Sequence, residues 1–233
     1  MSRSVPYGND TCTLWLRVND PCHYDVAGGT YEAVVTKWLT ENLKPGDTFF
    51  DIGANIGYYA VLAARLIGPE GIVIAVEADP NVAQILTKNF EANHLSNARV
   101  ISGAVTDFSG TVRLGCAPAS GWTGFYYRTA DKWVEVPAFT VDSLVRSLRL
   151  THVDVIKIDV EGAEGRVLDG MTDTFRRLEP KLLIEVHCGH SGIEEHVFRV
   201  LEIHRFNNEI LDLADTTMHV AATPTLTSAG GRV

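Results

Sequence analysis

The most constraining feature of the sequence is a glycine-bearing turn between a short apolar segment and a helical one. Thr48–Ile52 has the length and composition of a buried strand, and Tyr58–Ile67 has the pattern of a helix. Between them lie Gly53 and Gly57, which allow the backbone to turn tightly. A second apolar segment, Ile72–Val76, follows the helix. This strand–helix–strand order implies neighbouring parallel strands.

The same alternation continues along the chain. Further helices are predicted at Tyr31–Leu43, 79–93, Val141–Leu148, Glu164–Gly170 and Ile193–Arg205, and further strands at Arg99–Ser102, Thr111–Leu114, Val134–Val136, Asp154–Ile158, Lys181–Val186, Glu209–Leu213 and His219–Ala222. We therefore expect an α/β fold with a doubly wound, seven-stranded, mostly parallel sheet. Residues 30–233 are predicted to form a single domain. An irregular extension over residues 1–29 precedes it, with candidate short strands at Leu14–Val18 and His23–Val26.

Composition and charge narrow the class of protein. Apolar residues make up 45% of the 233 residues and charged residues 21%, as in ordinary soluble domains. The formal net charge of -9 repels phosphate backbones and disfavours a nucleic-acid substrate. We find neither a signal-peptide core nor an apolar run long enough to span a bilayer, and we expect a cytoplasmic protein. The four cysteines form no C-x-x-C pair, and the run 187–190 (HCGH) has no second ligand pair, so no metal site is expected.

The turn after the first strand has the features of a ligand-binding site. Asp51 lies at the end of a strand, at the sheet edge where α/β proteins bind ligands. The next residues form the turn and the start of the helix, whose free N–H groups attract a carboxylate: Gly53, Ala54, Asn55 and Gly57. The spacing G-x-x-x-G differs from the dinucleotide pattern G-x-G-x-x-G, whose middle glycine approaches a pyrophosphate. S-adenosylmethionine, a cationic nucleoside without phosphate, fits this turn. The alternative is a structural turn with a chance acid.

The ends of the next two strands complete the predicted nucleoside site. Glu77, followed by Ala78, ends the second strand, where a carboxylate accepts hydrogen bonds from ribose hydroxyls. Ala104 follows the third strand and is expected to border the adenine, and Asp107 is a candidate partner for the adenine amino group. A solvated strand end for Glu77 and an ordinary turn residue for Asp107 are the alternatives.

Carboxylates and a histidine gather at the ends of the fourth and fifth strands. Asp159, Glu161 and Glu164 follow the fourth strand, and Glu185 and His187 end the fifth. Such groups can orient an acceptor hydroxyl or take its proton, so Asp159, Glu161, Glu185 and His187 are our candidate catalytic residues. The role of Lys157 stays open. The alternatives are carboxylates that complement a helix N-terminus and a buried Glu185–His187 pair with a structural role.

The segment 115–133 is a candidate acceptor-binding insertion. It is rich in glycine, serine and aromatic residues and has the composition of a loop. Its aromatic residues are Trp122, Phe125, Tyr126, Tyr127 and Trp133. Loops carry many binding residues, and aromatic rings stack on sugars and flat molecules. The alternative is that these rings only pack on the sheet.

Five segments, taken in order, resemble the FkbM-type methyltransferases. They read DIGANIGYYA, VEADPN, AFTVDSLV, VIKIDVEGAE and LLIEVH, and the similarity runs from about Tyr31 to His187. The resemblance implies the Rossmann-like class I methyltransferase fold, S-adenosylmethionine as donor, and O-methylation of a hydroxyl on a small molecule such as a natural product, sugar or lipid. On that pattern the donor-binding residues are Asp51, Gly53, Asn55, Gly57 and Glu77. Asp159 would lie near the reacting methyl group.

Two other functions are compatible with parts of this pattern. An NAD-dependent oxidoreductase would also use Glu77 on a ribose, although the dinucleotide pattern is missing. A non-catalytic protein would keep the fold and bind the nucleoside only for regulation or stability.

Overall fold

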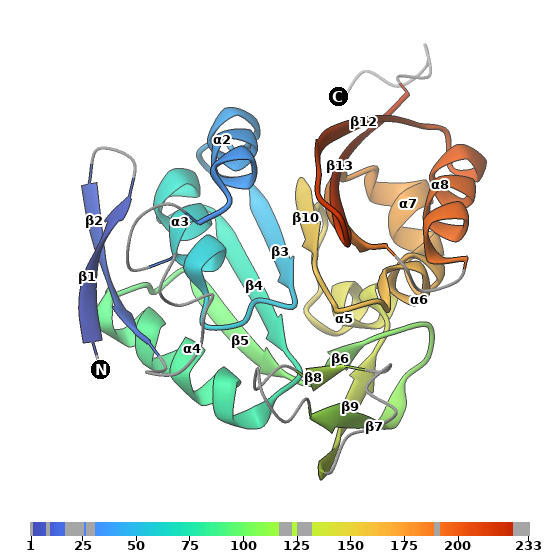
Figure 1. Ribbon diagram of the computed structural model, residues 1–233. Coiled ribbons are helices and arrows are strands. Elements are labelled where there is room, and N and C mark those ends of the chain that lie inside the picture. The colour runs from blue at the N-terminus through green and yellow to red at the C-terminus, as the bar shows by residue number, and fades with distance from the viewer. Residues whose placement is uncertain are drawn as a thin grey trace.

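The computed structural model describes residues 2–7, 10–16, 26, 31–116, 123–124, 132–188 and 192–225 (Figure 1). Its main sheet has seven strands in the order β12-β13-β11-β10-β3-β4-β5. The strands are β3 (Thr48–Ile52), β4 (Ile72–Glu77), β5 (Ala98–Ser102), β10 (Val155–Ile158), β11 (Lys181–His187), β12 (Phe206–Leu213) and β13 (Thr217–Pro224). β13 runs antiparallel to both of its neighbours, and the central pairs are parallel. The predicted α/β fold with a seven-stranded, mostly parallel sheet is confirmed.

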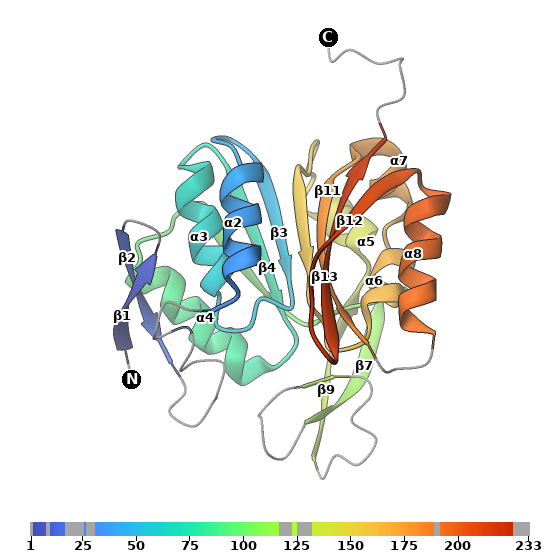
Figure 2. The same ribbon diagram turned by 45° about the horizontal axis from the view of Figure 1, so that its top comes forward.

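Helices cover both faces of this sheet (Figure 2). One face carries α2 (Ala33–Asn42), α3 (Tyr58–Ile67) and α4 (Pro80–Ala92). The other face carries α5 (Val141–Ser147), α6 (Glu164–Asp169), α7 (Thr172–Leu178) and α8 (Ile193–Ile203). Neighbouring residues of β3 point to opposite faces, so Phe49 belongs to the first core and Phe50 to the second, both fully buried. This double burial explains why the central strands are apolar without alternation.

The order of the strands reverses between β3 and β10. From β3 the chain builds outward through β4 to β5, and it then returns to place β10 on the other side of β3. Ligands bind at such a reversal, beyond the carboxyl ends of the strands. This point in the sheet brings the predicted donor turn beside the predicted catalytic strand ends.

A second, four-stranded sheet has the order β6-β9-β7-β8. Its strands are β6 (Ala104–Val105), β7 (Gly110–Cys116), β8 (Thr123–Gly124) and β9 (Lys132–Phe139). The predicted strands Thr111–Leu114 and Val134–Val136 lie in β7 and β9. Of the segment 115–133, the residues 117–122 and 125–131 lie outside the described residues, and with them Trp122, Phe125, Tyr126 and Tyr127. The acceptor-binding role of this segment stays a prediction.

The N-terminal segment forms a hairpin that the sequence does not predict. β1 (Ser2–Tyr7) pairs antiparallel with β2 (Asp10–Trp15), so the strand expected at Leu14–Val18 lies earlier in the chain. Its position is fixed by two side chains of the α4 region. Asn93 accepts from the Thr13 N–H and donates to the Thr13 carbonyl, and Asn89 accepts from the Trp15 N–H. The strand expected at His23–Val26 lies outside the described residues except for Val26, which is buried and helical.

Apart from these differences, the predicted elements differ from the observed ones by a few residues at their ends. The short helix α7 and the two-residue strands β6 and β8 are additions to the prediction. Within the described ranges, no helix has the length and apolarity needed to cross a bilayer.

Candidate functional site

The turn between β3 and α3, Gly53 to Gly57, is called the donor turn below because it is the predicted donor-binding segment. Its backbone adopts the left-handed conformation that glycine allows. Gly53 has a φ of 80° and Gly57 one of 88°, and Asn55 between them has a φ of 50°. The N–H groups of Gly53 and Ala54 both donate to the carbonyl of Val76, at 2.9 and 3.0 Å. The turn that follows β3 is therefore tied to the end of β4.

Gly53 also brings the turn against the end of β10. A Cβ built on Gly53 would lie 1.6 Å from the carbonyl oxygen of Asp159, so no side chain fits there. The Asp159 N–H donates to the Ile52 carbonyl at 2.9 Å, and this hydrogen bond also joins the end of β3 to the end of β10. The donor turn and the first catalytic candidate therefore share one rigid contact.

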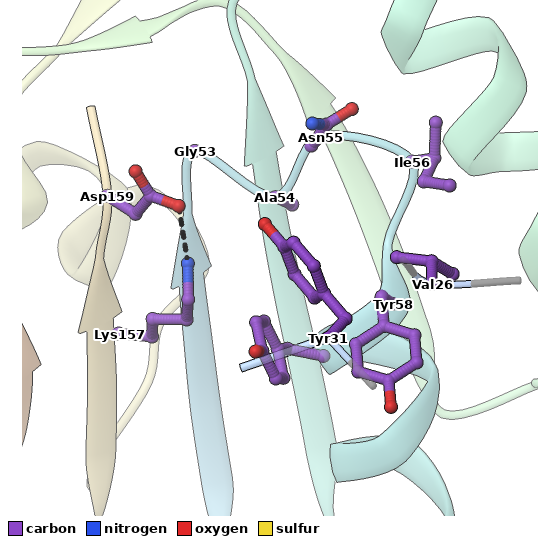
Figure 3. Close-up of a pocket in the computed structure, with 10 residues that line it drawn as sticks. Val26, Tyr31, Gly53, Ala54, Asn55, Ile56, Tyr58, Lys157 and Asp159 are labelled. Atoms are coloured by element: carbon purple, nitrogen blue, oxygen red, sulfur yellow. Dashed lines mark hydrogen bonds and ion pairs between the residues drawn. The ribbon is translucent and has the colours of Figure 1, made fainter. Parts of the chain in front are cut away.

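A pocket opens beside this turn (Figure 3). Its walls come from the turn itself, from the start of α3 and from β10; the lining residues include Gly53, Asn55, Tyr58, Lys157 and Asp159. In Figure 3 the Lys157 ammonium and the Asp159 carboxylate face each other at its edge.

Asp51 lies at the base of this region with its charge uncompensated by hydrogen bonds. It is 1% exposed, and among the described residues neither carboxylate oxygen has a hydrogen-bond partner. The closest cation is the Lys157 ammonium, 3.9 Å from Oδ1. Burial raises the pKa of Asp51 to about 6. Asp51 is therefore a buried carboxylate whose nearby cation is Lys157.

Glu77 is held where the sequence predicts a ribose partner. Its two oxygens accept from the N–H groups of Asn55 and Asp79, each at 2.8 Å. Burial raises its pKa to about 7, and these two hydrogen bonds oppose that rise. A carboxylate oxygen has more than one lone pair, so an anchored Glu77 can still accept from a ligand hydroxyl. Glu77 thus links the donor turn to the start of α4.

Ala78 and Ala104 meet in one small apolar cluster with Leu114 and Val136 of the second sheet. Asp107, in contrast, is an exposed residue that pairs with Arg166 of α6, at 2.7 Å from Nη2 and 2.9 Å from Nε. Burial would raise the pKa of Asp107, but hydrogen bonds from Thr106 and Arg166 outweigh it and lower the pKa. Its predicted role at the adenine stays a prediction, and Arg166 is a partner that the sequence did not indicate.

Lys157 lies between Asp51 at the end of β3 and Asp159 after β10. Its ammonium lies 3.0 Å from Asp159 Oδ2, 3.9 Å from Asp51 Oδ1 and 5.2 Å from the centre of the Tyr59 ring. The residue is 3% exposed. Burial acts to lower its pKa, but the charges of Asp159 and Asp51 dominate and raise it. The same pairing lowers the pKa of Asp159 against the effect of burial. The role left open for Lys157 is therefore that of a buried counter-charge.

Glu161, Glu164 and His187 form a second group at this edge. The imidazole of His187 lies between two carboxylates, with Nδ1 2.8 Å from Glu164 Oε1 and Nε2 3.5 Å from Glu161 Oε2. Glu164 is fully buried and also accepts from the Gly162 N–H at 2.9 Å. Burial acts to lower the pKa of His187, but the hydrogen bond to Glu164 and the charge of Asp159 raise it to about 9. Burial and the charge of Asp159 raise the pKa of Glu161 to about 7.

The alternative of a buried pair of Glu185 and His187 is not what the structure shows. Glu185 lies opposite His219 in the antiparallel ladder between β11 and β13, and its Oε2 is 3.7 Å from His219 Nε2. His187 instead takes its partners from the segment that follows β10. The sequence reasoning missed His219 and Glu32, which share this region, because both reach it from distant segments.

Comparison with known proteins gives matches over most of the chain. The family model of the Methyltransferase FkbM domain matches residues 51–215, from the donor turn to β12. Hexuronic acid methyltransferase AglP of Haloferax volcanii is 27% identical over 158 residues, which are 68% of this chain and 63% of that protein. The 31-O-demethyl-FK506 methyltransferase FkbM of Streptomyces tacrolimicus is 28% identical over 195 residues, covering 70% of this chain and 74% of that protein. The chain thus spans somewhat under two thirds of the length of AglP.

Solved structures share the fold at low sequence identity. Precorrin-6y C5,15-methyltransferase from Geobacter metallireducens has a TM-score of 0.54 at 14% identity and covers 84% of this chain and 89% of its own. Aeropyrum pernix fibrillarin, solved with natively bound S-adenosyl-L-methionine, has a TM-score of 0.51 at 16% identity, over 78% of this chain and 68% of its own. The fold is therefore that of the class I S-adenosylmethionine-dependent methyltransferases.

Proposed function

The chain belongs to the FkbM methyltransferase family, and from this premise we propose that it transfers a methyl group from S-adenosylmethionine to a hydroxyl oxygen of a small molecule. The observation that carries the proposal is the family match, which spans both the donor turn and the carboxylates at the ends of β10 and β11. Methyl transfer to oxygen is supported by the name of one relative, which acts on 31-O-demethyl-FK506. A sugar acid is a second acceptor class, by the name of AglP.

The residues of the donor turn fit S-adenosylmethionine. The buried Asp51, which lacks a hydrogen-bond partner among the described residues, suits a cationic ligand group. The start of α3 after Gly57 offers backbone N–H groups to the carboxylate of the amino-acid tail. Glu77, anchored by two N–H groups, has lone pairs left with which to accept from the ribose hydroxyls. When bound, S-adenosylmethionine supplies a methyl group that is already activated by its sulfonium.

Because the donor is activated, the chain's own task is to hold the acceptor hydroxyl and take its proton. We assign the base to Glu161. Its side chain is 25% exposed, so an acceptor can reach it, and its pKa of about 7 suits proton transfer near neutral pH. Asp159 is a weaker base because Lys157 holds its pKa low. Glu185 faces His219 instead of His187.

His187 and Glu164 act as positioning residues for this base. With a pKa of about 9, His187 carries a proton at neutral pH and cannot accept another. Its Nε2 side faces Glu161 at 3.5 Å, while Glu164 fixes the ring through Nδ1 at 2.8 Å. The imidazolium therefore orients the Glu161 carboxylate. Paired carboxylate and imidazole groups hold each other's orientation in the same way at metal sites.

The acceptor-binding site is assigned to the segment 115–133 and the sheet that carries it. Trp133 on β9 is 45% exposed, and the Arg113 guanidinium lies 5.6 Å from the centre of its ring. An exposed ring beside a guanidinium suits a sugar acid, since the ring can stack on the sugar and the cation can pair with the carboxylate.

The test is methyl transfer by the purified chain, followed by mass spectrometry. S-adenosylmethionine is combined with hexuronic acid glycosides and with O-demethylated macrolides, and a gain of one methyl group on oxygen is expected. Calorimetry with S-adenosylhomocysteine and with NADH accompanies the assay. Binding of NADH without S-adenosylhomocysteine would favour the oxidoreductase alternative. Donor binding without transfer to any hydroxylated acceptor would favour the non-catalytic one.

A further inference from the structure

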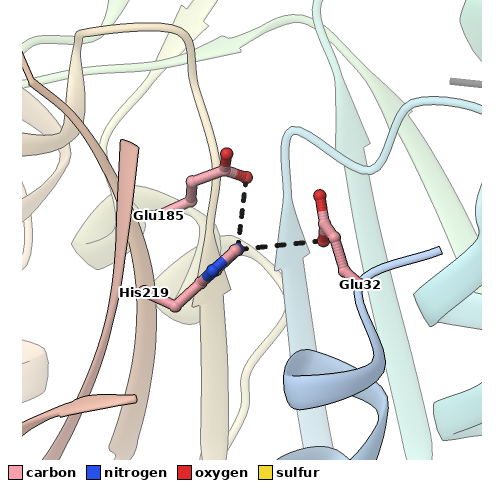
Figure 4. Close-up of side chains that lie close together, drawn as sticks. All are labelled: Glu32, Glu185 and His219. Carbon is pink, nitrogen blue, oxygen red and sulfur yellow. Dashed lines mark ion pairs between the residues drawn. The ribbon is translucent and has the colours of Figure 1, made fainter. Parts of the chain in front are cut away.

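Three side chains from distant parts of the chain converge beside the donor pocket (Figure 4). Glu32 immediately precedes α2, Glu185 lies on β11 and His219 lies on β13. Glu185 and His219 are direct partners in the antiparallel ladder, so they point to the same face of the sheet. Glu32 approaches them across that face.

The spacing of these side chains allows them to serve as ligands of one metal ion. His219 Nε2 lies 3.7 Å from Glu185 Oε2 and 3.9 Å from Glu32 Oε2, and all three ligand atoms lie within 4.8 Å of one another. Charge-assisted hydrogen bonds between such groups are about 2.7–2.9 Å long. Around a tetrahedral ion with bonds of about 2.1 Å, neighbouring ligand atoms lie roughly 3.4 Å apart. Small side-chain rotations would close the difference.

The histidine supplies a second, independent observation. His219 is 8% exposed, and its Nε2 is buried without a hydrogen-bond partner in the part of the chain that the structure describes. A buried polar atom without a partner is costly. In Figure 4 this nitrogen faces both carboxylates. An ion between the three groups would satisfy it.

A neighbouring side chain holds one of the ligands in place, and the nearest lysine pairs elsewhere. Tyr59 donates a hydrogen bond of 2.7 Å to Glu32 Oε2, which fixes that carboxylate. The Lys157 ammonium is already shared by Asp159 and Asp51 and so does not neutralise Glu32 or Glu185 by direct contact.

We propose that Glu32, Glu185 and His219 form a binding site for a divalent transition-metal ion. One imidazole nitrogen and two carboxylate oxygens suit Mn²⁺ or Zn²⁺. The ion would tie the start of α2 to β11 and β13, next to the donor pocket. This proposal does not depend on the proposed methyl transfer.

The test is metal binding by the whole chain, first stripped with a chelator, without donor or acceptor. Calorimetric titration with MnCl₂ and with ZnCl₂ is expected to show one ion per chain. His219→Ala should weaken binding by roughly 100-fold or more, because it removes a direct ligand. His152→Ala is the matched control: His152 is an exposed histidine 3.9 Å from Asp154, and its removal should leave binding unchanged.

A second variant keeps the test decisive where His219→Ala fails to fold. Glu185→Gln preserves size and should also weaken binding, while circular dichroism verifies the fold. Pulsed electron paramagnetic resonance of bound Mn²⁺ should show a directly bonded imidazole nitrogen in the wild type. The proposal is overturned if the wild type binds neither ion. It is also overturned if His187→Ala abolishes binding while His219→Ala keeps it, since the ion would then belong to the cluster of Asp159, Glu161 and His187.

Discussion

The two halves of the carboxyl edge of the sheet are built in different ways. At β3 and β4 the site is mostly backbone, with left-handed glycines and N–H groups beside the carboxylates of Asp51 and Glu77. At β10, β11 and β13 it is made of side chains, with carboxylates arranged around Lys157, His187 and His219. If the first half binds the donor as proposed, it can do so with little side-chain chemistry. The other half holds the ionisable groups that proton transfer requires.

The contrast also concerns distance along the chain. Most of the predicted donor-binding residues lie in one strand–helix–strand unit, between Asp51 and Glu77. The other half collects groups from as far apart as Glu32 and His219. A site whose residues are close in sequence tolerates substitutions elsewhere in the chain. A site whose residues come from distant segments depends on the correct assembly of the whole sheet. Five experiments test this contrast.

The largest effect is expected where a side chain of the second half acts directly. Glu161→Gln should lower kcat by about 10²–10⁴-fold, because the proton acceptor is lost. Donor affinity, measured by calorimetry, should stay unchanged if the two halves are as separate as we infer. Glu202→Gln, an exposed change on α8, is the control. Equal turnover in both variants would remove Glu161 from the mechanism.

Lys157→Met tests the buried ion pairs that link Asp51 in the first half of the edge to Asp159 in the second. It leaves Asp51 and Asp159 buried without their shared ammonium, and breaking a buried pair in this way costs about 3–5 kcal/mol of unfolding free energy. Urea denaturation measures this loss. Lys37→Met removes an exposed lysine that pairs with Glu41, and it should cost under about 1 kcal/mol. Similar losses in both variants would contradict a special role for the buried pair.

Gly53→Ala tests the backbone half. The new Cβ would collide with the Asp159 carbonyl and would also occupy a positive φ, so a loss of about 3 kcal/mol or more and weak donor binding are expected. Gly46→Ala separates the two causes. Gly46 has a φ of 89° with nothing within 4 Å of the built Cβ, so only the conformational cost of about 1–2 kcal/mol applies. Equal losses would show that close packing at Gly53 does not matter.

Asn89→Ala tests whether a side chain from α4 stabilises the donor turn. Asn89 is fully buried, donates to the Ile56 carbonyl at 2.7 Å and accepts from the Trp15 N–H. Its loss should cost about 1–3 kcal/mol, because these buried groups lose their partner. Asn208→Ala, an exposed change on β12, should stay within about 0.5 kcal/mol. A neutral Asn89→Ala would mean that the turn does not need the N-terminal hairpin.

The pH dependence of kcat/KM gives the smallest effect but identifies the base. Glu161 accepts a proton only when ionised, so kcat/KM should fall about tenfold per pH unit below its pKa. That pKa is about 7. A limb near 9 would instead point to His187, whose pKa is about 9 and which accepts a proton only above that value.

The contrast explains what could be predicted from the sequence. The bounds predicted for β3 and α3 coincide with the observed Thr48–Ile52 and Tyr58–Ile67, because strand, turn and helix signals are local there. Helix α7 escaped prediction because its first turn is capped from a distance. The Asp142 carboxylate of α5 accepts from the N–H groups of Asp173 and Thr174.

In the candidate site, too, features set by local sequence could be predicted, and contacts between distant segments could not. The positions of the carboxylates at the strand ends could be predicted from the order of the elements. Their partners could not, because His219 reaches Glu185 through an antiparallel ladder, and Glu164 reaches His187 from a separate helix. Side-chain pairing across a sheet depends on register, which one-dimensional patterns do not specify.

The contact of Gly53 with the end of β10 has a consequence for how such an enzyme can diversify. Since two backbone segments touch there without an intervening side chain, the distance between the turn after β3 and the end of β10 is set by the scaffold itself. New acceptors must then be accommodated in the peripheral loops. Grafting loops between relatives should accordingly redirect such an enzyme to another alcohol while the transfer geometry is inherited unchanged.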